Sequence, residues 1–285
     1  MSRRQLAIAA ALSWAPFASA YAACPTDDEV KTYVEDRIAG RPTSALAKDG
    51  SLDDAMCAQD KVVSLLQPHM GKPIGYKVAL TSKAVQEQFG ATAPILGVLF
   101  ESMMLKEGES VPAAPGMLYE PDLIVVVKDE GINTARTPEE VVRHIAEVVP
   151  FIELPGMGYA QGEPVNAVTI AAANAGANRG VTGAPIPVEP TPEFTRALAD
   201  MKVIMTDQDG KEIASAPGSA ILAHPLNAVV FLTDALKAKG QSLKAGDLVS
   251  LGSFARPHPA EPGLTATIRY DGLRGAPKVS VEFTE

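Results

Sequence analysis

Two hydrophobic periods alternate along the chain and distinguish helical segments from strands. Apolar residues spaced three and four apart predict helices over 28–39, 52–66, 83–89, 138–148 and 225–239. Residues typical of helix starts precede several of these segments, such as Ser51 or Asp53 before the second, and Gly90 and Gly240 follow two of them. Helices are therefore expected mainly early in the chain.

Strand-like segments dominate the rest of the sequence. Their apolar runs lie at 74–80, 122–128, 151–154, 201–206, 213–216, 247–251, 265–270 and 278–283. The run at 122–128 (DLIVVVK) has the strongest strand signal, the residues 207–210 (DQDG) predict a hairpin turn, and Pro- and Gly-rich stretches around 155–190 predict loops. The pattern predicts an α+β fold in which a mixed, largely antiparallel sheet curls on itself beside N-terminal helices.

The first 23 residues have the pattern of a cleavable signal peptide. Arg3 and Arg4 precede a largely apolar run over 6–17, and residues 18–22 (ASAYA) offer small residues at the spacing that signal peptidase recognises. This run is short for a membrane helix, and no later segment approaches the ~20 apolar residues that one needs. We therefore expect a signal peptide at 1–23, a single domain at 24–285, and a periplasmic or secreted protein without a membrane partner. A buried N-terminal helix is the alternative.

Cysteine content and charge restrict the partners further. The chain has two cysteines, Cys24 and Cys57, and an oxidising compartment permits a bridge between them. Lipid attachment at Cys24 and a reactive thiol are the alternatives, although neither has the expected neighbouring residues. The formal net charge is −9, and it becomes more negative if Arg3 and Arg4 leave with the signal. An acidic surface disfavours nucleic acid and anionic membranes as partners.

Three carboxylates in strand-like surroundings are the candidate chemistry. Glu120 and Asp122 flank Pro121 at the start of the strongest strand, and alternation along a strand directs both side chains to the same side. Glu153 lies inside the apolar segment 151–154. Buried carboxylates repel one another and need compensation, and hard divalent cations such as Mg²⁺ or Mn²⁺ prefer oxygen ligands. The three residues therefore predict a metal site, with solvated strand ends as the alternative.

Five longer motifs follow one another along the chain. They are GYKVALTS at 75–82, EPD at 120–122, PFIE at 150–153, HPLNAV at 224–229 and LKAGDLVSLGS at 243–253. In this order they resemble motifs of the fumarylacetoacetate hydrolase family, in its branch of 2-keto-4-pentenoate hydratases and 2-oxo-hexenedioate decarboxylases. The likeness runs from about residue 28 to the C-terminus.

The resemblance implies a fumarylacetoacetate hydrolase C-terminal-like fold and a metal-dependent hydro-lyase that self-associates as a homo-oligomer. Such an enzyme adds water to a 2-hydroxy-2,4-dienoate and gives a 4-hydroxy-2-oxo acid, with Mg²⁺ or Mn²⁺ as Lewis acid on a small 2-keto acid. The resemblance assigns the metal to Glu120, Asp122 and Glu153, catalysis to Lys77 and Ser253, and substrate contacts to Asn174 and Gly252. Lys77 would bind the substrate carboxylate or move a proton, and a lowered pKa of Lys77 would help either role.

Departures from the family pattern leave other functions open. Ile95 and Ala173 stand where the family has acids, and Asp122 is shorter than the family's glutamate. A decarboxylase of the same family and an exported 2-keto acid binding protein without turnover are the alternatives to a hydratase. A folded relative without a metal is a third. His224 in the HPLNAV motif is interpreted as a structural residue at a helix start.

Overall fold

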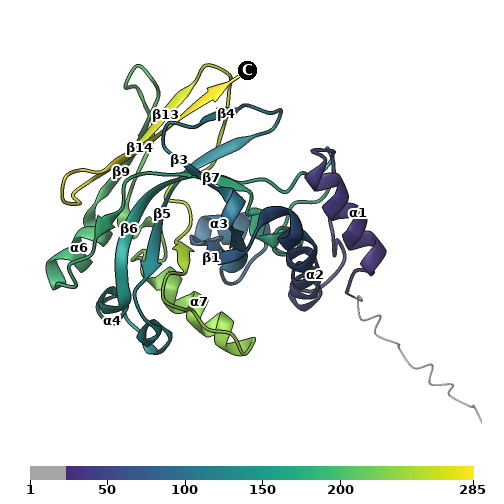
Figure 1. Cartoon of the computed structure of the whole chain (residues 1–285), viewed down its shortest axis with the longest axis horizontal. Coiled ribbons are helices and arrows are strands. Elements are labelled where there is room, and N and C mark those ends of the chain that lie inside the picture. Colours follow the sequence, from purple (N-terminus) through teal and green to yellow (C-terminus); the bar gives the residue numbers. More distant parts are fainter. Residues whose placement is uncertain (1–23) are drawn as a thin grey trace, which may run out of the picture.

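Two sheets form the framework of the protein (Figure 1), and the computed structural model describes residues 24–285. The larger, nine-stranded sheet contains β1 (Pro73–Ala79), β2 (Ile95–Phe100), β3 (Met104–Lys106), β5 (Leu118–Val127), β6 (Ile145–Leu154), β7 (Arg179–Thr182), β8 (Ile186–Pro187), β11 (Leu248–Ser250) and β12 (His258–Pro259). Its main order is β2-β1-β11-β5-β6-β7-β3. The smaller sheet contains β4 (Ser110–Pro112), β9 (Lys202–Thr206), β10 (Glu212–Pro217), β13 (Thr265–Asp271) and β14 (Lys278–Thr284), in the order β10-β9-β13-β14-β4.

Most neighbouring strands are antiparallel. The parallel pairs are β1 with β11, β3 with β7 and β4 with β14. The mixed, largely antiparallel sheet of an α+β fold is thus confirmed, as is the hairpin at 207–210, which joins β9 to β10.

The helices begin largely where the sequence predicts. They are α1 (Asp27–Ile38), α2 (Leu52–Met70), α3 (Lys83–Phe89), α4 (Pro138–Val141), α5 (Ala167–Ala172), α6 (Pro192–Asp200) and α7 (Asn227–Ala238). Thr26 and Ser51 close capping boxes at the starts of α1 and α2, and Gly90 ends α3 in the left-handed conformation. Figure 1 shows α1 and α2 together at one side of the molecule, away from β13 and β14.

The larger sheet is covered on both faces. One face packs against the smaller sheet and α7 through a cluster that includes Leu123, Leu232 and Tyr270. The other face carries α1, α2 and α5 over β1 and β2, and a small cluster of Ile124, Val149 and Phe151 farther along. Polar side chains on this second face are therefore shielded from water.

Three predictions of secondary structure were wrong, and the first of them has a tertiary reason. The helix expected over 138–148 stops after one short turn of α4 and a 3₁₀ turn (Val142–His144), because the β-branched residues that follow join the sheet as β6. The loops expected around 155–190 contain α5 and the buried strand β7. The strand expected to begin at residue 122 begins at residue 118, so Glu120 and Asp122 lie within it, with Pro121 between them.

The N-terminal helices are tied together covalently. A disulfide joins Cys24, just before α1, to Cys57 in α2. The bridge that the sequence permits is therefore present, and it excludes a free thiol at either position. The expected signal peptide at 1–23 lies outside the described residues. Within residues 24–285, none of the helices combines the length and the hydropathy required to cross a bilayer.

Candidate functional site

Five polar side chains lie on one face of the larger sheet, where β1, β11, β5 and β6 run side by side. We call them the polar site: Lys77, Glu120, Asp122, Glu153 and Ser250. Strand register brings them together, because Lys77 pairs with Ser250 and Glu120 pairs with Glu153, and paired residues share a face. None is more than 8% exposed. The structure thus assembles Lys77 with the three predicted carboxylates.

Charge is unbalanced within the polar site. The Lys77 ammonium forms a buried ion pair with Glu153 Oε1. Glu153 Oε2 is also buried, and no group of residues 24–285 hydrogen-bonds to it. One lysine thus faces three carboxyl groups where water cannot screen them. Extra protons or a further cation must compensate the remaining negative charge.

The Asp122 carboxylate is held from several sides. Oδ1 accepts hydrogen bonds from the backbone N–H of Leu123 at 2.5 Å and of Gly252 at 3.0 Å. Oδ2 accepts a hydrogen bond from the Ser250 hydroxyl. This carboxylate therefore has a fixed orientation, unlike Glu120, for which residues 24–285 provide no hydrogen bond to the side chain within the usual limits.

A tyrosine from the smaller sheet braces the strands at the same point. The Tyr270 hydroxyl, on β13, donates to the backbone carbonyl of Asp122 and accepts from the N–H of Phe151 at 3.2 Å. These two residues are register partners in β5 and β6. Tyr270 thus satisfies two buried backbone groups next to the carboxylates. Its contribution depends on contacts between the two sheets, so the sequence gives no sign of it.

Burial and mutual repulsion shift the protonation of the site. Burial, together with the nearby charge of Glu153, raises the pKa of Asp122 to about 8 and raises that of Glu120 well above its usual range. Burial alone would lower the pKa of Lys77, but Glu153, Glu120 and Asp122 outweigh it, and the pKa of Lys77 is raised. The surroundings of Lys77 thus raise its pKa, whereas a lowered pKa would favour its expected role.

The donor set suits a hard divalent cation, although the side chains do not converge on one. Three carboxylates offer oxygen ligands, and one buried oxygen of Glu153 lacks a hydrogen-bond partner among the described residues. The site also has less positive than negative charge. In residues 24–285, no three acidic, histidine or cysteine side chains meet at one point as in a formed metal site. Glu153 is turned to Lys77 and Asp122 to Ser250. A bound cation would have to draw Glu153 away from Lys77.

The remaining predicted residues flank the polar site. The segment that follows β11 passes close to Pro121. The Pro121 carbonyl accepts hydrogen bonds from the Phe254 N–H at 2.9 Å and from the Ser253 hydroxyl at 3.4 Å. Gly252 adopts φ +102°, and a side chain there would collide with Thr81. Catalysis by Ser253 and substrate contact at Gly252 stay predictions at positions beside the carboxylates.

Asn174 acts as a clamp on β2. Its amide donates to the Val98 carbonyl at 2.9 Å and accepts from the Val98 N–H at 2.7 Å. The backbone carbonyl of Asn174 lies against Gly97, the register partner of Lys77 in β2. The side chain is committed to these backbone bonds, so substrate contact by Asn174 stays a prediction. His224 is structural as interpreted, because it accepts from the Leu226 N–H at 3.1 Å next to α7.

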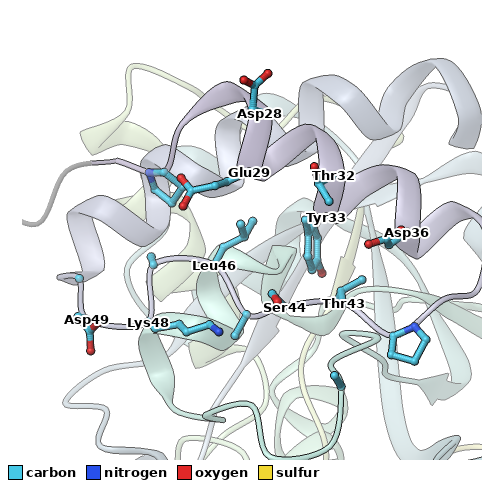
Figure 2. Close-up of a pocket in the computed structure, with 16 residues that line it drawn as sticks. Asp28, Glu29, Thr32, Tyr33, Asp36, Thr43, Ser44, Leu46, Lys48 and Asp49 are labelled. Carbon is cyan, nitrogen blue, oxygen red and sulfur yellow. The ribbon is translucent and has the colours of Figure 1, made fainter.

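A pocket of about 810 Å³ lies elsewhere, between α1 and residues 42–50 (Figure 2). Figure 2 shows Asp28, Glu29 and Asp36 along the helix that borders it, with Lys48 and Asp49 on the facing segment. No member of the polar site lines this pocket. Its acidic side chains are mostly solvated, so their charge needs no compensation.

Ser250 is the site residue that sequence reasoning missed. A weak signal existed, because Ser250 interrupts the apolar run Val249-Ser250-Leu251, and a buried polar residue needs a partner. The identity of that partner could not be predicted, since Asp122 is 128 residues away in sequence.

The chain is similar in sequence and in fold to known proteins. No family model matches the chain. The chain is 29% identical over 244 residues to a 2-keto-4-pentenoate hydratase of Paraburkholderia xenovorans, covering 82% of this chain and 87% of that protein. It is 30% identical over 206 residues to 2-keto-4-pentenoate hydratase 1 of Dechloromonas aromatica, covering 70% and 74%. The structure of 4-oxalocrotonate decarboxylase from Pseudomonas putida G7, complexed with magnesium and adipate, shares the fold: TM-score 0.79, 24% identity, 92% of this chain and 99% of that chain.

Protonation of the polar site predicts an unusual pH dependence of stability. An unfolded aspartate titrates near pH 3.9, whereas Asp122 in the folded protein titrates near pH 8. A carboxyl group with a raised folded-state pKa stabilises the fold while it is protonated, and this stability is lost as the pH rises from about 4 through about 8. Chelator-treated protein should therefore have a higher urea midpoint at pH 6 than at pH 8.5.

Asp122→Asn should shrink that difference, because the amide does not titrate. Glu282→Gln, at an exposed position of β14, is the matched control and should leave the difference unchanged. A urea midpoint of the parent protein that rises from pH 6 to pH 8.5 would contradict the prediction.

Proposed function

The chain belongs to the family of 2-keto-4-pentenoate hydratases and 4-oxalocrotonate decarboxylases, and from this premise we propose that it is a divalent-metal-dependent hydro-lyase of small 2-keto acids. Its reaction would add water to a 2-hydroxy-2,4-dienoate and give a 4-hydroxy-2-oxo acid. The observation that carries the proposal is the buried set of three carboxylates against one lysine.

The polar site supplies carboxylate ligands for a divalent cation and one ammonium group. Glu120, Asp122 and Glu153 would hold Mg²⁺ or Mn²⁺, which when bound supplies Lewis acidity toward the carboxylate and 2-oxo oxygens of the substrate. The similar decarboxylase structure with magnesium and adipate supports a divalent ion. Burial of all three ligands strengthens their electrostatic effect, because the surrounding dielectric is low.

Lys77 is the proton-handling and carboxylate-binding group of the proposed enzyme. Its ammonium is held by Glu153 and lies on the same sheet face as the other carboxylates. Once freed from Glu153, the ammonium would pair with the substrate carboxylate or donate a proton from Nζ. Asn174 contributes indirectly, because it fixes β2 beside Lys77. Ser253 and Gly252 would contact the substrate from the segment after β11.

A decarboxylase of the same family is the second candidate. The presence of 4-oxalocrotonate decarboxylases among the chain's relatives in sequence favours it. When a 2-oxo-hex-3-enedioate loses CO₂ from the carboxylate far from its 2-oxo group, the electron pair passes through the conjugated double bond onto the 2-oxo oxygen as a dienolate. The same residues would therefore serve both reactions. Ile95 and Ala173 stand where the family has acids, and both are buried in the apolar cluster with α1 and α2. Because these acids are missing, the experiments below also test a third candidate, a binding protein without turnover.

The activity test uses the ultraviolet absorbance of 2-hydroxypenta-2,4-dienoate. Purified protein with Mg²⁺ or Mn²⁺ should bleach this absorbance, and chelator should stop it. Glu120→Gln and Lys77→Met should each lower kcat/KM by at least about a hundredfold, because each removes a charge that acts directly on substrate or ion. Glu282→Gln should retain the parent activity.

Product analysis separates the candidates. A 4-hydroxy-2-oxo acid without CO₂ identifies a hydratase, and CO₂ release from a 2-oxo-hexenedioate identifies a decarboxylase. Metal-dependent binding of substrate without either product would contradict an enzyme and leave the binding protein.

We also propose that the chain is exported and that residues 1–23 are removed as a signal peptide. The disulfide between Cys24 and Cys57 supports an oxidising compartment, because such bridges are rare where thiols are kept reduced. Cell fractionation of a bacterial host that expresses the full chain should recover a shortened, bridged protein from the periplasm or medium, as judged by intact mass. Full-length protein confined to the cytoplasm would contradict export.

Light scattering on the same sample tests the further proposal of a homo-oligomer, which predicts a molar mass that is a multiple of the mass of one chain.

A further inference from the structure

Ser250 occupies a central place in the polar site. It lies in β11, which is hydrogen-bonded to β1 on one side and to β5 on the other. Its register partner in β1 is Lys77, and its partner in β5 is Ile124, two residues from Asp122 on the same face. Ser250 therefore lies between Lys77, which would bind the substrate, and Asp122, which would bind the ion.

The Ser250 hydroxyl is the one side-chain donor to Asp122 among the hydrogen bonds of residues 24–285. The other two donors are the backbone N–H groups of Leu123 and Gly252, and both go to Oδ1. Ser250 alone reaches Oδ2. Both residues are 0% exposed, so water does not replace this bond if the hydroxyl is lost.

The three carboxylates differ in what holds them. Glu153 is held by Lys77, whose ammonium must move to act on a substrate. Within residues 24–285, Glu120 has no side-chain hydrogen bond of ordinary length, and its carboxyl group interacts with that of Glu153 instead. Asp122 is therefore the most firmly held of the three carboxylates, and Ser250 alone restrains its second oxygen.

We propose that Ser250 is a positioning residue for the divalent cation, which it orients by holding Oδ2 of Asp122. The proposal rests on the metal site of the proposed function. Removal of the hydroxyl frees Asp122 to rotate about Oδ1 and lowers the affinity for the ion without removing any ligand. Loss of such an outer partner typically weakens metal binding by about 10- to 100-fold.

Manganese binding by chelator-treated protein tests the proposal, with free Mn²⁺ followed by electron paramagnetic resonance. Ser250→Ala should raise the dissociation constant about 10- to 100-fold, and Ser250→Thr, which keeps a hydroxyl, should stay close to the parent. Thr233→Val is the matched control, because it removes a buried hydroxyl that bonds only within α7. Thermal unfolding in chelator checks that each variant folds. If Ser250→Ala does not fold, Ser250→Cys replaces it, since a thiol is a weak donor and should give an intermediate affinity.

The outcomes distinguish this inference from the proposed function. A parent that binds Mn²⁺ and a Ser250→Ala variant that binds it equally well would overturn the role of Ser250 and leave the metal site intact. Equal losses in Ser250→Ala and Thr233→Val would also overturn it, because a general loss of packing would then explain the effect. A parent that binds no Mn²⁺ would overturn both. Loss in Ser250→Ala with recovery in Ser250→Thr is the expected result.

Discussion

The imbalance between one ammonium and three carboxyl groups on a buried sheet face is the constraint on which the rest of the described structure depends. Lys77 neutralises one negative charge at most, and it is bound to Glu153. Burial and the nearby charge of Glu153 raise the pKa of Asp122 and of Glu120, so bound protons offset part of the remaining negative charge. A divalent cation would neutralise this negative charge more completely. Binding of such an ion would also stabilise the fold, because it would relieve the repulsion between the buried carboxylates.

The surrounding fold keeps these groups in place against their repulsion. Tyr270 reaches from the smaller sheet to brace β5 and β6 at Asp122. On the other side, Arg37 of α1 donates to the carbonyls of Ala173 and Ala177 and holds the turn that contains Asn174. Asn174 has φ +58°, a left-handed conformation that asparagine tolerates, and Ala175 has φ +51°, where the same conformation is strained and persists because neighbours enforce it. That turn in turn clamps β2 beside Lys77, so both sheets and the disulfide-linked N-terminal helices support the polar site.

The sequence predicted the parts of this arrangement that depend on local signals. Capping residues defined α1, α2 and α3, and alternation placed Glu120 and Asp122 on one face. Residues 138–148 were predicted wrongly, because their apolar spacing suits a helix as well as a buried strand and only pairing with β5 decides between them. The roles of Ser250, Tyr270 and Asn174 depend on contacts across 76 to 148 residues of sequence, which no local pattern encodes. The raised pKa of Lys77 has the same origin.

Calorimetric titration of Mn²⁺ into chelator-treated parent and Lys77→Met tests most directly whether this charge imbalance forms a cation site. The ammonium and a divalent ion would compete for Glu153 and repel each other at short range, where a low dielectric strengthens the repulsion. The parent should bind one ion per chain, and Lys77→Met should bind it roughly tenfold more tightly, although it lacks activity, since about 1.4 kcal/mol of relieved repulsion is a factor of ten. Absence of binding in both proteins, or weaker binding in Lys77→Met, would contradict a cation site built on these three carboxylates.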